Sequence, residues 1–209
     1  FRYCQYMRQM EKCDAVGLQV GRAGVKYCYM CRGERGENTL NILVFADSHG
    51  RNIAMAAAVE REKPDAVIHL GDYADDAREL ERLFPMLPVY RVRGNNDYKP
   101  DVAQYAVITP DNLPIYITHG HKERVSMLAC GILPQRAREE GCLVALYGHT
   151  HRMLLERIDG VLVCNPGSIS LPRGGPASYA RLTIENAQLR AVTLLDEDGG
   201  LIRRDKFRQ

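Results

Sequence analysis

The sequence predicts one α/β domain over residues 41–209, in which two sheets pack face to face with helices outside. Two patterns indicate this class: strand-like and helical segments alternate in the first part of the region, and strand-like runs joined by short turns fill most of the remainder. A chain of 209 residues that is 45% hydrophobic and 26% charged can bury a sizeable core.

The first part of the domain reads as βαβαβ. A continuous apolar run from Asn41 to Ala46 is typical of a strand buried on both faces. We expect a helix over 50–62, a second strand over 66–70, a second helix over 75–84 and a third strand over 89–93. The expected inner faces of the two helices consist of Ile53, Ala56 and Ala57 in the first, and Ala77, Leu80 and Phe84 in the second.

The second part is dominated by strand-like runs. They cover 103–109, 113–118, 143–147, 153–158, 161–164, 179–184 and 189–195. Only 122–140 leaves room for another helix or two. Asp159-Gly160 and Glu185-Asn186-Ala187 are typical of tight hairpin turns. The basic stretch 203–208 is expected to be a solvated C-terminus.

Residues 1–40 are interpreted as an N-terminal extension outside the fold. The first 39 residues contain four of the seven cysteines and lack a sustained period. Cys28-Tyr29-Met30-Cys31 has the spacing of half a zinc knuckle, but no second close pair accompanies it, which favours a structural or accidental origin. Codons for residues 34–37 can spell a ribosome-binding sequence before Leu40, so the extension is hypothesised to be translated upstream DNA. Intact-mass analysis of the natural protein would test this.

Charge and hydropathy exclude two classes of partner. A net charge of +2 is too small for a protein held by many nucleic-acid phosphates. No apolar run approaches the roughly 20 residues that span a bilayer, and no signal peptide is recognised, so we expect a cytoplasmic protein without a membrane partner. Cys130, Cys142 and Cys164 are interpreted as buried thiols. Homo-oligomerisation is left open.

Five polar motifs each follow a short apolar run, and all six histidines lie in or beside them. The motifs are Asp47-Ser48-His49-Gly50, Gly71-Asp72, Gly94-Asn95-Asn96-Asp97, Thr118-His119-Gly120-His121 and Gly148-His149-Thr150-His151. Ligands bind at the carboxyl ends of strands in open α/β sheets. The residue types in the five motifs suit two divalent cations, which need a bridging carboxylate, neutral imidazoles and amide or carboxylate oxygens. The expected metal ligands are Asp47, His49, Asp72, Asn95, His119, His149 and His151, with Asp72 as the bridge.

The motif series D-x-H, G-D, G-N-x-D, H and G-H-x-H resembles the calcineurin-like metallophosphoesterase superfamily. The short length and Asn165-Pro166-Gly167-Ser168 are similar to its small single-domain branch, which contains the YfcE-type phosphodiesterases and the retromer scaffold subunit. The resemblance implies a four-layer αββα sandwich. It also implies that Asp47, His49, Asp72 and His151 hold one metal and that Asp72, Asn95, His119 and His149 hold the other. The implied metal is manganese, exchangeable with Zn²⁺, Fe²⁺, Ni²⁺ or Mg²⁺.

The expected reaction is hydrolysis of a small phosphodiester by a hydroxide that bridges the two metals. The expected catalytic residues are Asp72, Asn95, Asp97 and His121. Asp97 is predicted to orient a nearby imidazole. Many relatives place a histidine that protonates the leaving group at the position of Asn96, and we hypothesise that His121 replaces it.

Two other functions remain open: a non-catalytic scaffold that binds protein partners, and a phosphomonoesterase. Completeness of the ligand set favours an enzyme over the scaffold. His69, inside an apolar strand, is interpreted as a satisfied core residue, and Ser48 and Thr150 as turn-forming residues and not nucleophiles.

Overall fold

The computed structural model describes residues 19–21, 24–28, 39–98, 101–126 and 129–207. It contains two mixed sheets and, within these ranges, three α-helices, which confirms the predicted fold class. The elements are β1 (Gln19–Gly21), β2 (Gly24–Cys28), β3 (Thr39–Phe45), α2 (Asn52–Glu62), β4 (Ala66–His69), α3 (Ala74–Leu83), β5 (Val89–Arg91), β6 (Tyr105–Thr109), the 3₁₀ turn η1 (Pro110–Asn112), β7 (Ile115–Thr118), α4 (Leu133–Glu139), β8 (Val144–Leu146), β9 (Met153–Ile158), β10 (Val161–Pro166), β11 (Ser178–Glu185), β12 (Gln188–Asp196) and β13 (Leu201–Lys206).

Each sheet combines parallel and antiparallel pairs. The six-stranded sheet has the order β13-β12-β11-β3-β4-β5, and the seven-stranded sheet has the order β1-β2-β6-β7-β8-β10-β9. The predicted βαβαβ unit forms the parallel strands β3, β4 and β5. In the other sheet β7, β8 and β10 are parallel. The carboxyl ends of these two parallel sets carry the five polar motifs.

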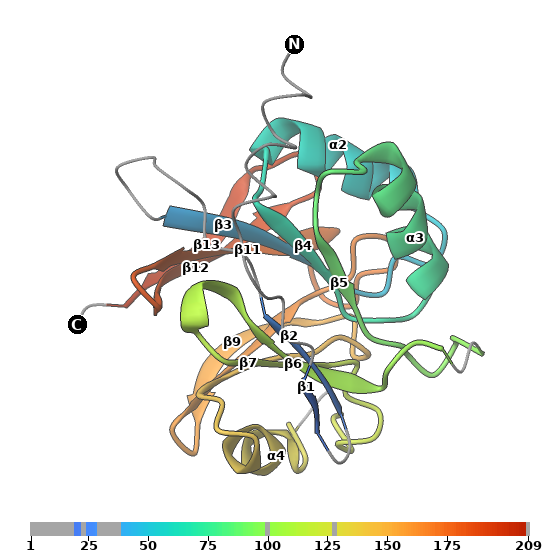
Figure 1. Ribbon diagram of the computed structural model, residues 1–209. Coiled ribbons are helices and arrows are strands. Elements are labelled where there is room, and N and C mark those ends of the chain that lie inside the picture. The colour runs from blue at the N-terminus through green and yellow to red at the C-terminus, as the bar shows by residue number, and fades with distance from the viewer. Residues whose placement is uncertain (1–18, 22–23, 29–38, 99–100, 127–128, 208–209) are drawn as a thin grey trace.

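The layers follow the sequence αββα. In β3, Ile42 and Val44 face the core between the sheets, whereas Leu43 and Phe45 pack against the helices. Helices α2 and α3 cover the outer face of the six-stranded sheet, and α4 covers the seven-stranded sheet on the opposite side of the molecule (Figure 1). Both faces of β3 are therefore buried, as the continuous apolar run predicts.

The predicted inner face of α2 is correct for Ala56, which packs against the core cluster beneath the helices, and wrong for the other two residues. Ile53 is 82% exposed and Ala57 is also exposed, while the buried residues are Met55, Ala58 and Val59. Because α2 is rich in alanine, its apolar residues surround the helix and give little directional signal. In α3 the prediction is correct for Ala77 and Leu80, which are buried. Phe84 is partly buried and packs against the core cluster that contains Leu80.

Sequence patterns missed the last strand. Residues 201–206 form β13, which pairs antiparallel with β12 at the sheet edge and keeps its side chains mostly exposed. The expectation of solvent exposure is correct for these residues, but the backbone is paired. An edge strand with both faces exposed to solvent has no alternation of apolar and polar residues, so its sequence does not predict a strand.

Two short strands lie within the N-terminal extension. Strand β1 pairs with β2, and β2 runs parallel to β6 at the edge of the seven-stranded sheet. The domain boundary near residue 40 stays a prediction, and the half zinc knuckle lies largely outside the described residues.

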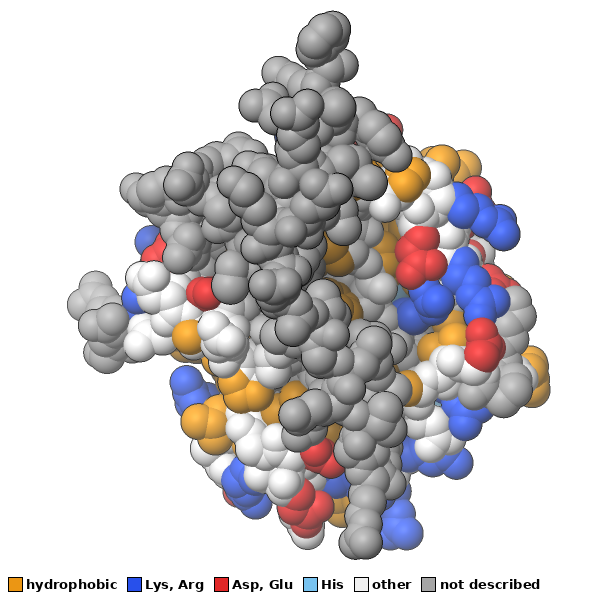
Figure 2. All heavy atoms as spheres, in the orientation of Figure 1, with side chains coloured by type: hydrophobic (Ala, Val, Ile, Leu, Met, Phe, Trp, Pro, Cys, Tyr) orange, Lys and Arg blue, Asp and Glu red, His pale blue; other side chains and the backbone are white. Residues whose placement is uncertain are grey.

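The described surface mixes both signs of charge. Figure 2 shows acidic and basic side chains next to one another on the side of the molecule where α3 lies, and there Arg78 pairs with Asp75 and Arg82 with Glu79. Of the helices that the structure describes, none is long and apolar enough to cross a membrane.

Candidate metal centre

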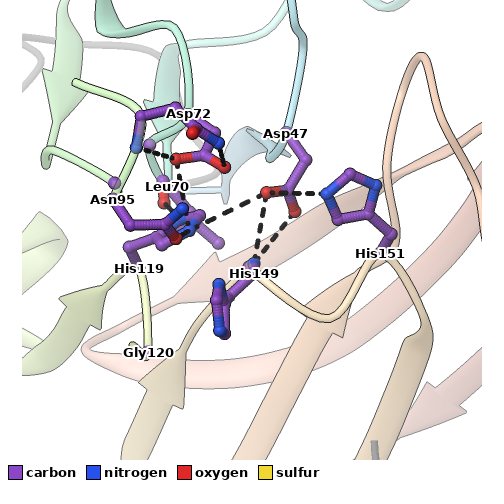
Figure 3. Close-up of polar contacts among 12 residues, drawn as sticks. Asp47, Leu70, Asp72, Asn95, His119, Gly120, His149 and His151 are labelled. Carbon is purple, nitrogen blue, oxygen red and sulfur yellow. Dashed lines mark hydrogen bonds and ion pairs between the residues drawn. The ribbon is translucent and has the colours of Figure 1, made fainter. Parts of the chain in front are cut away.

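The polar motifs of both sheets meet at one place. Asp47, Asp72 and Asn95 follow β3, β4 and β5 of the six-stranded sheet, while His119 follows β7 and the pair His149 and His151 follows β8 of the other sheet. Figure 3 shows these side chains gathered from both sides. The site therefore depends on how the two sheets are packed.

Most of the predicted ligands occupy left-handed backbone conformations. The φ angles are 52° for Asp47, 43° for His49, 54° for Asp72, 69° for His149 and 58° for His151. Residues with side chains seldom adopt positive φ, and such strained positions cluster at functional sites. These conformations allow the tight turns that direct neighbouring ligands toward one point.

Four of the predicted ligands converge closely. One donor atom from each of Asp47, His49, Asp72 and His151 lies within 4.8 Å of all the others. The Nε2 atoms of His49 and His151 are 3.4 Å apart, and Nε2 of His151 is 3.5 Å from Oδ1 of Asp47. Ligand atoms that surround one cation at about 2.1 Å lie about 3.0 to 3.4 Å from one another, so this spacing suits a single metal ion.

The remaining predicted ligands form a second group beside the first. Nε2 of His119 lies 3.1 Å from Oδ1 of Asn95 and 3.4 Å from Oδ1 of Asp72. The ring of His149 lies 5.1 Å from that of His119, and Figure 3 shows it pointing away from Asp47. The backbone amide of His149 donates to Asp47 Oδ2 at 3.0 Å. Asp72 lies close to both groups, at 3.9 Å from Nε2 of His49 and 3.4 Å from Nε2 of His119, and Oδ1 of Asp47 also lies 4.0 Å from Nε2 of His119.

The hydrogen bonds of two histidines make their inward nitrogens acceptors. Nδ1 of His119 contacts the carbonyl of Leu70 at 2.8 Å, and Nδ1 of His151 contacts the carbonyl of Leu171 at 2.7 Å. A carbonyl only accepts, so each Nδ1 carries the proton and each Nε2 presents a lone pair. These lone pairs face carboxylate and amide oxygens, which are acceptors too. Acceptors that face one another repel, and a divalent cation between them would stabilise the arrangement.

Burial favours the neutral form of His119, His149 and His151, which metal binding requires. Burial lowers the pKa of His119 to about 4, against the opposing charge of Asp72. The pKa values of His149 and His151 are also lowered, chiefly by burial.

The pKa values of the two carboxylates are shifted in opposite directions. Burial, followed by the nearby charge of Asp72, raises the pKa of Asp47 well above its ordinary value. Burial acts the same way on Asp72, but attraction to His119 when that imidazole is protonated and two hydrogen bonds from Asn96 outweigh it, and the pKa of Asp72 is lowered. The exposed residue Arg173 lies close enough for its positive charge to oppose the shift of Asp47. Asp72 is thus the carboxylate that is held ionised without a metal.

Asn96 contacts the proposed bridging carboxylate directly, which its sequence position did not predict. Its backbone amide donates to Asp72 Oδ1 at 3.0 Å and its side-chain amide donates to Asp72 Oδ2 at 2.7 Å. Gly94 makes room for this contact, because a Cβ there would lie 2.0 Å from Asp72 Oδ1. Asn96 therefore supports Asp72, although its side chain cannot act as the general acid that many relatives have at this position.

The predicted partner of Asp97 is wrong. Its carboxylate accepts hydrogen bonds from the backbone amides of Gly94, Tyr73 and Ala74, at 2.8, 3.0 and 2.8 Å, and its described hydrogen bonds include none from an imidazole. It caps the N-terminus of α3, where a negative charge is favourable. Asp97 thus supports the backbone around Asp72 instead of orienting a histidine.

Residues 165–173, which we call the strap, connect the two ligand loops. Ser168 Oγ donates to the carbonyl of Asp47 at 2.8 Å, and Ser170 Oγ donates to the same oxygen at 3.0 Å. On the other loop, Asn165 donates to the carbonyl of Gly148 at 2.8 Å. The strap also holds His151, whose Nδ1 donates to Leu171 and whose carbonyl accepts from Arg173 N–H at 2.9 Å. The strap therefore begins at the end of β10 and links candidate ligands of both sheets.

A second buried chain of hydrogen bonds supports Asp47-Ser48-His49. The amide of Gly71 donates to Nδ1 of His69, so Nε2 of His69 carries the proton and donates to Ser48 Oγ at 2.9 Å. The Ser48 hydroxyl then donates to Asp76 Oδ2 at 2.7 Å. His69 is a satisfied buried residue, as predicted, and Ser48 is engaged in shaping the loop.

His121 lies beside the second ligand group. Its ring is 5.5 Å from that of His119 and 6.2 Å from that of His149. Its Nδ1 is buried and has no hydrogen-bond partner among the described residues. Burial lowers the pKa of His121. His121 therefore lies at the site, and one of its ring nitrogens has no hydrogen-bond partner among the described residues.

The αββα sandwich carries a candidate metal site of aspartates and histidines from both sheets at one edge. Residues 40–187 match the family model of the calcineurin-like phosphoesterase superfamily domain. The chain therefore belongs to the calcineurin-like phosphoesterase superfamily.

Individual relatives agree with this family. The chain is 35% identical to the probable metallophosphoesterase YsnB of Bacillus subtilis, over 78% of this chain and 95% of that protein. It is 30% identical to the phosphodiesterase YfcE of Escherichia coli K12, over 74% of this chain and 83% of the relative. A crystal structure of a predicted phosphoesterase from Streptococcus pneumoniae matches with a TM-score of 0.68 and 30% identity, over 81% of this chain and 97% of that one.

Proposed function

We propose that this protein is a phosphodiesterase that hydrolyses a small phosphodiester with two divalent cations. The observation that carries the proposal is the convergence of Asp47, His49, Asp72 and His151 within 4.8 Å, with Asn95 and His119 adjoining Asp72. Membership of the phosphoesterase family supports hydrolysis of a phosphate ester, and the name of the relative YfcE supports a diester.

Each residue has a role in this proposal. Asp47, His49, Asp72 and His151 would hold the first cation, and Asp72, Asn95, His119 and His149 would hold the second. When bound, two such cations ionise a water near neutral pH and neutralise phosphoryl oxygens. Manganese is the proposed metal, because mixed imidazole and carboxylate ligands suit a first-row transition ion.

The chain's own residues prepare the site for a phosphate. Asn96 and the backbone around Gly94 hold Asp72 ionised, and the Nδ1 hydrogen bonds of His119 and His151 direct their lone pairs inward. His121 is proposed to protonate the leaving oxygen, because its ring lies beside those of His119 and His149. Such donation is typically worth 10²–10⁴-fold in rate.

The test is hydrolysis of bis(p-nitrophenyl) phosphate with added manganese, compared with the chelated protein and with Asp72→Asn. We expect metal-dependent turnover in the wild type and a loss of at least about 100-fold in Asp72→Asn, because the variant lacks the charged ligand shared by both groups. Absence of turnover with two equivalents of bound metal would contradict the proposal and favour the scaffold function.

Two controls sharpen this comparison. Asp75→Asn removes an exposed carboxylate from α3 and should leave turnover unchanged. p-Nitrophenyl phosphate measured in parallel separates a diesterase from a monoesterase, since a monoesterase would hydrolyse it faster than the diester.

A further inference from the structure

Tyr73 is an exposed aromatic residue at the edge of the metal centre. It directly follows Asp72 and precedes the first residue of α3. Its side chain is 46% exposed, and its ring lies 5.2 Å from that of His49 in an edge arrangement with an interplanar angle of 61°. The ring therefore contributes little to the core and keeps accessible surface beside a proposed metal ligand.

The backbone of Tyr73 is unfavourable for its side chain. Its φ and ψ angles are 76° and 57°, a left-handed conformation that glycine or asparagine adopts at lower cost. Core packing cannot account for a large aromatic residue here, because nearly half of it is exposed. Strain of this kind at the rim of a site indicates a function for the side chain.

The turn that carries Tyr73 is held by several hydrogen bonds. Asp97 Oδ1 accepts from the amide of Tyr73 at 3.0 Å and from the amide of Ala74 at 2.8 Å, and the carbonyl of Tyr73 accepts from the amide of Asp76 at 2.9 Å. These hydrogen bonds fix the backbone of Tyr73 next to Asp72, and the edge contact with His49 places the ring beside the site. A fixed aromatic surface binds a planar group at low entropic cost.

The flank of the site on the other side of His49 is cationic. The ring of His49 lies 5.2 Å from that of Tyr73 and 5.2 Å from that of His151. The His151 carbonyl accepts from the amide of Arg173, and Nε of Arg152 donates to the carbonyl of Arg173 at 3.0 Å. Both arginines are exposed, and neither forms an ion pair with a residue in the described ranges. An anionic substrate with one aromatic group matches these two flanks.

We propose that Tyr73 determines specificity by stacking on a planar aromatic group, such as a nucleobase, of the phosphodiester substrate. The inference rests on the proposed phosphodiesterase function and narrows its substrate class to diesters with a nucleoside-like substituent. Stacking of a base on an aromatic side chain tolerates any base, because every base presents a flat face.

The experiment compares two diesters that share a leaving group. Thymidine 5′-(p-nitrophenyl) phosphate carries a base on its retained group, and methyl p-nitrophenyl phosphate does not. Steady-state kinetics are measured on the manganese-loaded full chain for the wild type, Tyr73→Leu and Tyr73→Phe. Leu83→Ala, which alters an exposed residue at the other end of α3, is the control for disturbance of the helix.

We expect Tyr73→Leu to raise KM for the thymidine ester about tenfold, in line with the effect of removing one stacking contact, without changing KM for the methyl ester. Tyr73→Phe should restore the wild-type KM, and Leu83→Ala should resemble the wild type. Equal effects of Tyr73→Leu on both esters, or equal KM values of the wild type for both, would overturn the role in specificity while leaving the phosphodiesterase function intact.

Binding of thymidine 5′-monophosphate and of methyl phosphate to the metal-loaded protein, measured by calorimetry, separates the two proposals. If neither diester is hydrolysed but the nucleotide binds more tightly than methyl phosphate and Tyr73→Leu removes the difference, the phosphodiesterase function fails and the aromatic site stands. If the nucleotide has no such advantage, the proposal for Tyr73 fails.

Discussion

Individual side chains at the metal centre are prepared by their neighbours. His151 and His119 donate Nδ1 protons to carbonyls, Asn96 binds Asp72, and Asp97 caps the helix that follows Asp72. The motif residues themselves were recognisable, because aspartate and histidine at i and i+2 after apolar runs form an unusual pattern. Their supporting partners were not, because a carbonyl or an asparagine has no distinctive spacing.

Replacing His121 should affect substrates according to their leaving groups. We expect His121→Ala to slow hydrolysis of an alkyl phosphodiester by about 100-fold or more, because an alkoxide needs a proton as it departs. Bis(p-nitrophenyl) phosphate, whose leaving group is stable as an anion, should be hydrolysed within about twofold of the wild-type rate. Initial rates on the two substrates test this, and unchanged turnover of the alkyl ester would exclude His121 as the acid.

Burial of His69 should make the metal-free protein sensitive to acid. Burial lowers its pKa from 6.5 to about 4, although the charge of Asp76 opposes the shift. Between pH 6.5 and 4 the unfolded chain therefore binds a proton that the folded chain does not, so stability rises with pH in this window and is lost as pH falls. From pH 7 to pH 5 we expect this group to remove about 2 kcal/mol from the free energy of unfolding.

Urea unfolding in the presence of a chelator at pH 7 and pH 5 measures the effect. His119 titrates in the same window, so the share of His69 is the difference between the wild type and His69→Asn. An equal loss of stability in both proteins would show that His69 is not responsible.

The strap is the element that joins the ligand loops of different sheets. It contacts Asp47 through two serine hydroxyls, and Gly148 and His151 through its asparagine and its backbone. The hydroxyls of Ser168 and Ser170 bond to the loop after β3, while the amides of Ser170 and Leu171 bond to Ser168 Oγ within the strap. The motif Asn165-Pro166-Gly167-Ser168 could be recognised in the sequence, but its contact with Asp47 joins residues more than 100 positions apart and could not be read from spacing.

Removing the Ser168 hydroxyl should weaken metal binding. Ser168→Ala leaves the Asp47 carbonyl with one fewer donor and leaves the amides of Ser170 and Leu171 without their acceptor. Loss of a group that supports metal ligands typically lowers metal affinity by 10- to 100-fold, and we expect a change of about this size for manganese. Calorimetric titration of the metal-free protein measures it.

Ser178→Ala is the matched control for this variant. Ser178 is also fully buried, and its hydroxyl donates to the carbonyl of Pro166 at 2.7 Å without contacting Asp47. Both variants should lose a similar stability of about 1–3 kcal/mol, but only Ser168→Ala should lose metal affinity. A similar loss of affinity in both would indicate general loosening of the segment.

At the scale of the whole molecule, the site lies between two sheets whose strands alternate in blocks along the chain, because β6 to β10 of one sheet stand between β3–β5 and β11–β13 of the other. The core between them is formed by residues such as Ile42, Ile68, Ile117 and Leu146, which precede the ligand loops by a few positions. Packing of these side chains sets the distance between the two groups of ligands. The fold and the metal centre are therefore parts of one arrangement.

Shortening the chain tests the domain boundary. We expect residues 40–209 to fold and to keep metal-dependent turnover within about twofold of the full chain, because every proposed ligand and the core between the sheets lie in this range. Thermal unfolding and turnover of bis(p-nitrophenyl) phosphate measure the two properties. A large loss of stability would assign a structural role to the pairing of β2 with β6.

The order of strands and helices and the identity of the motif residues follow from local pattern alone. Apolar runs, helical spacing and turn residues act over a few neighbouring positions, and the polar residues after each strand stand out against them. Local pattern fails where it carries no contrast, as in the alanine-rich α2 and the exposed β13. The register of the sheets, the strap, the contact of Asn96 with Asp72 and the exposed position of Tyr73 were decided by tertiary packing, because each depends on atoms brought together from distant parts of the chain.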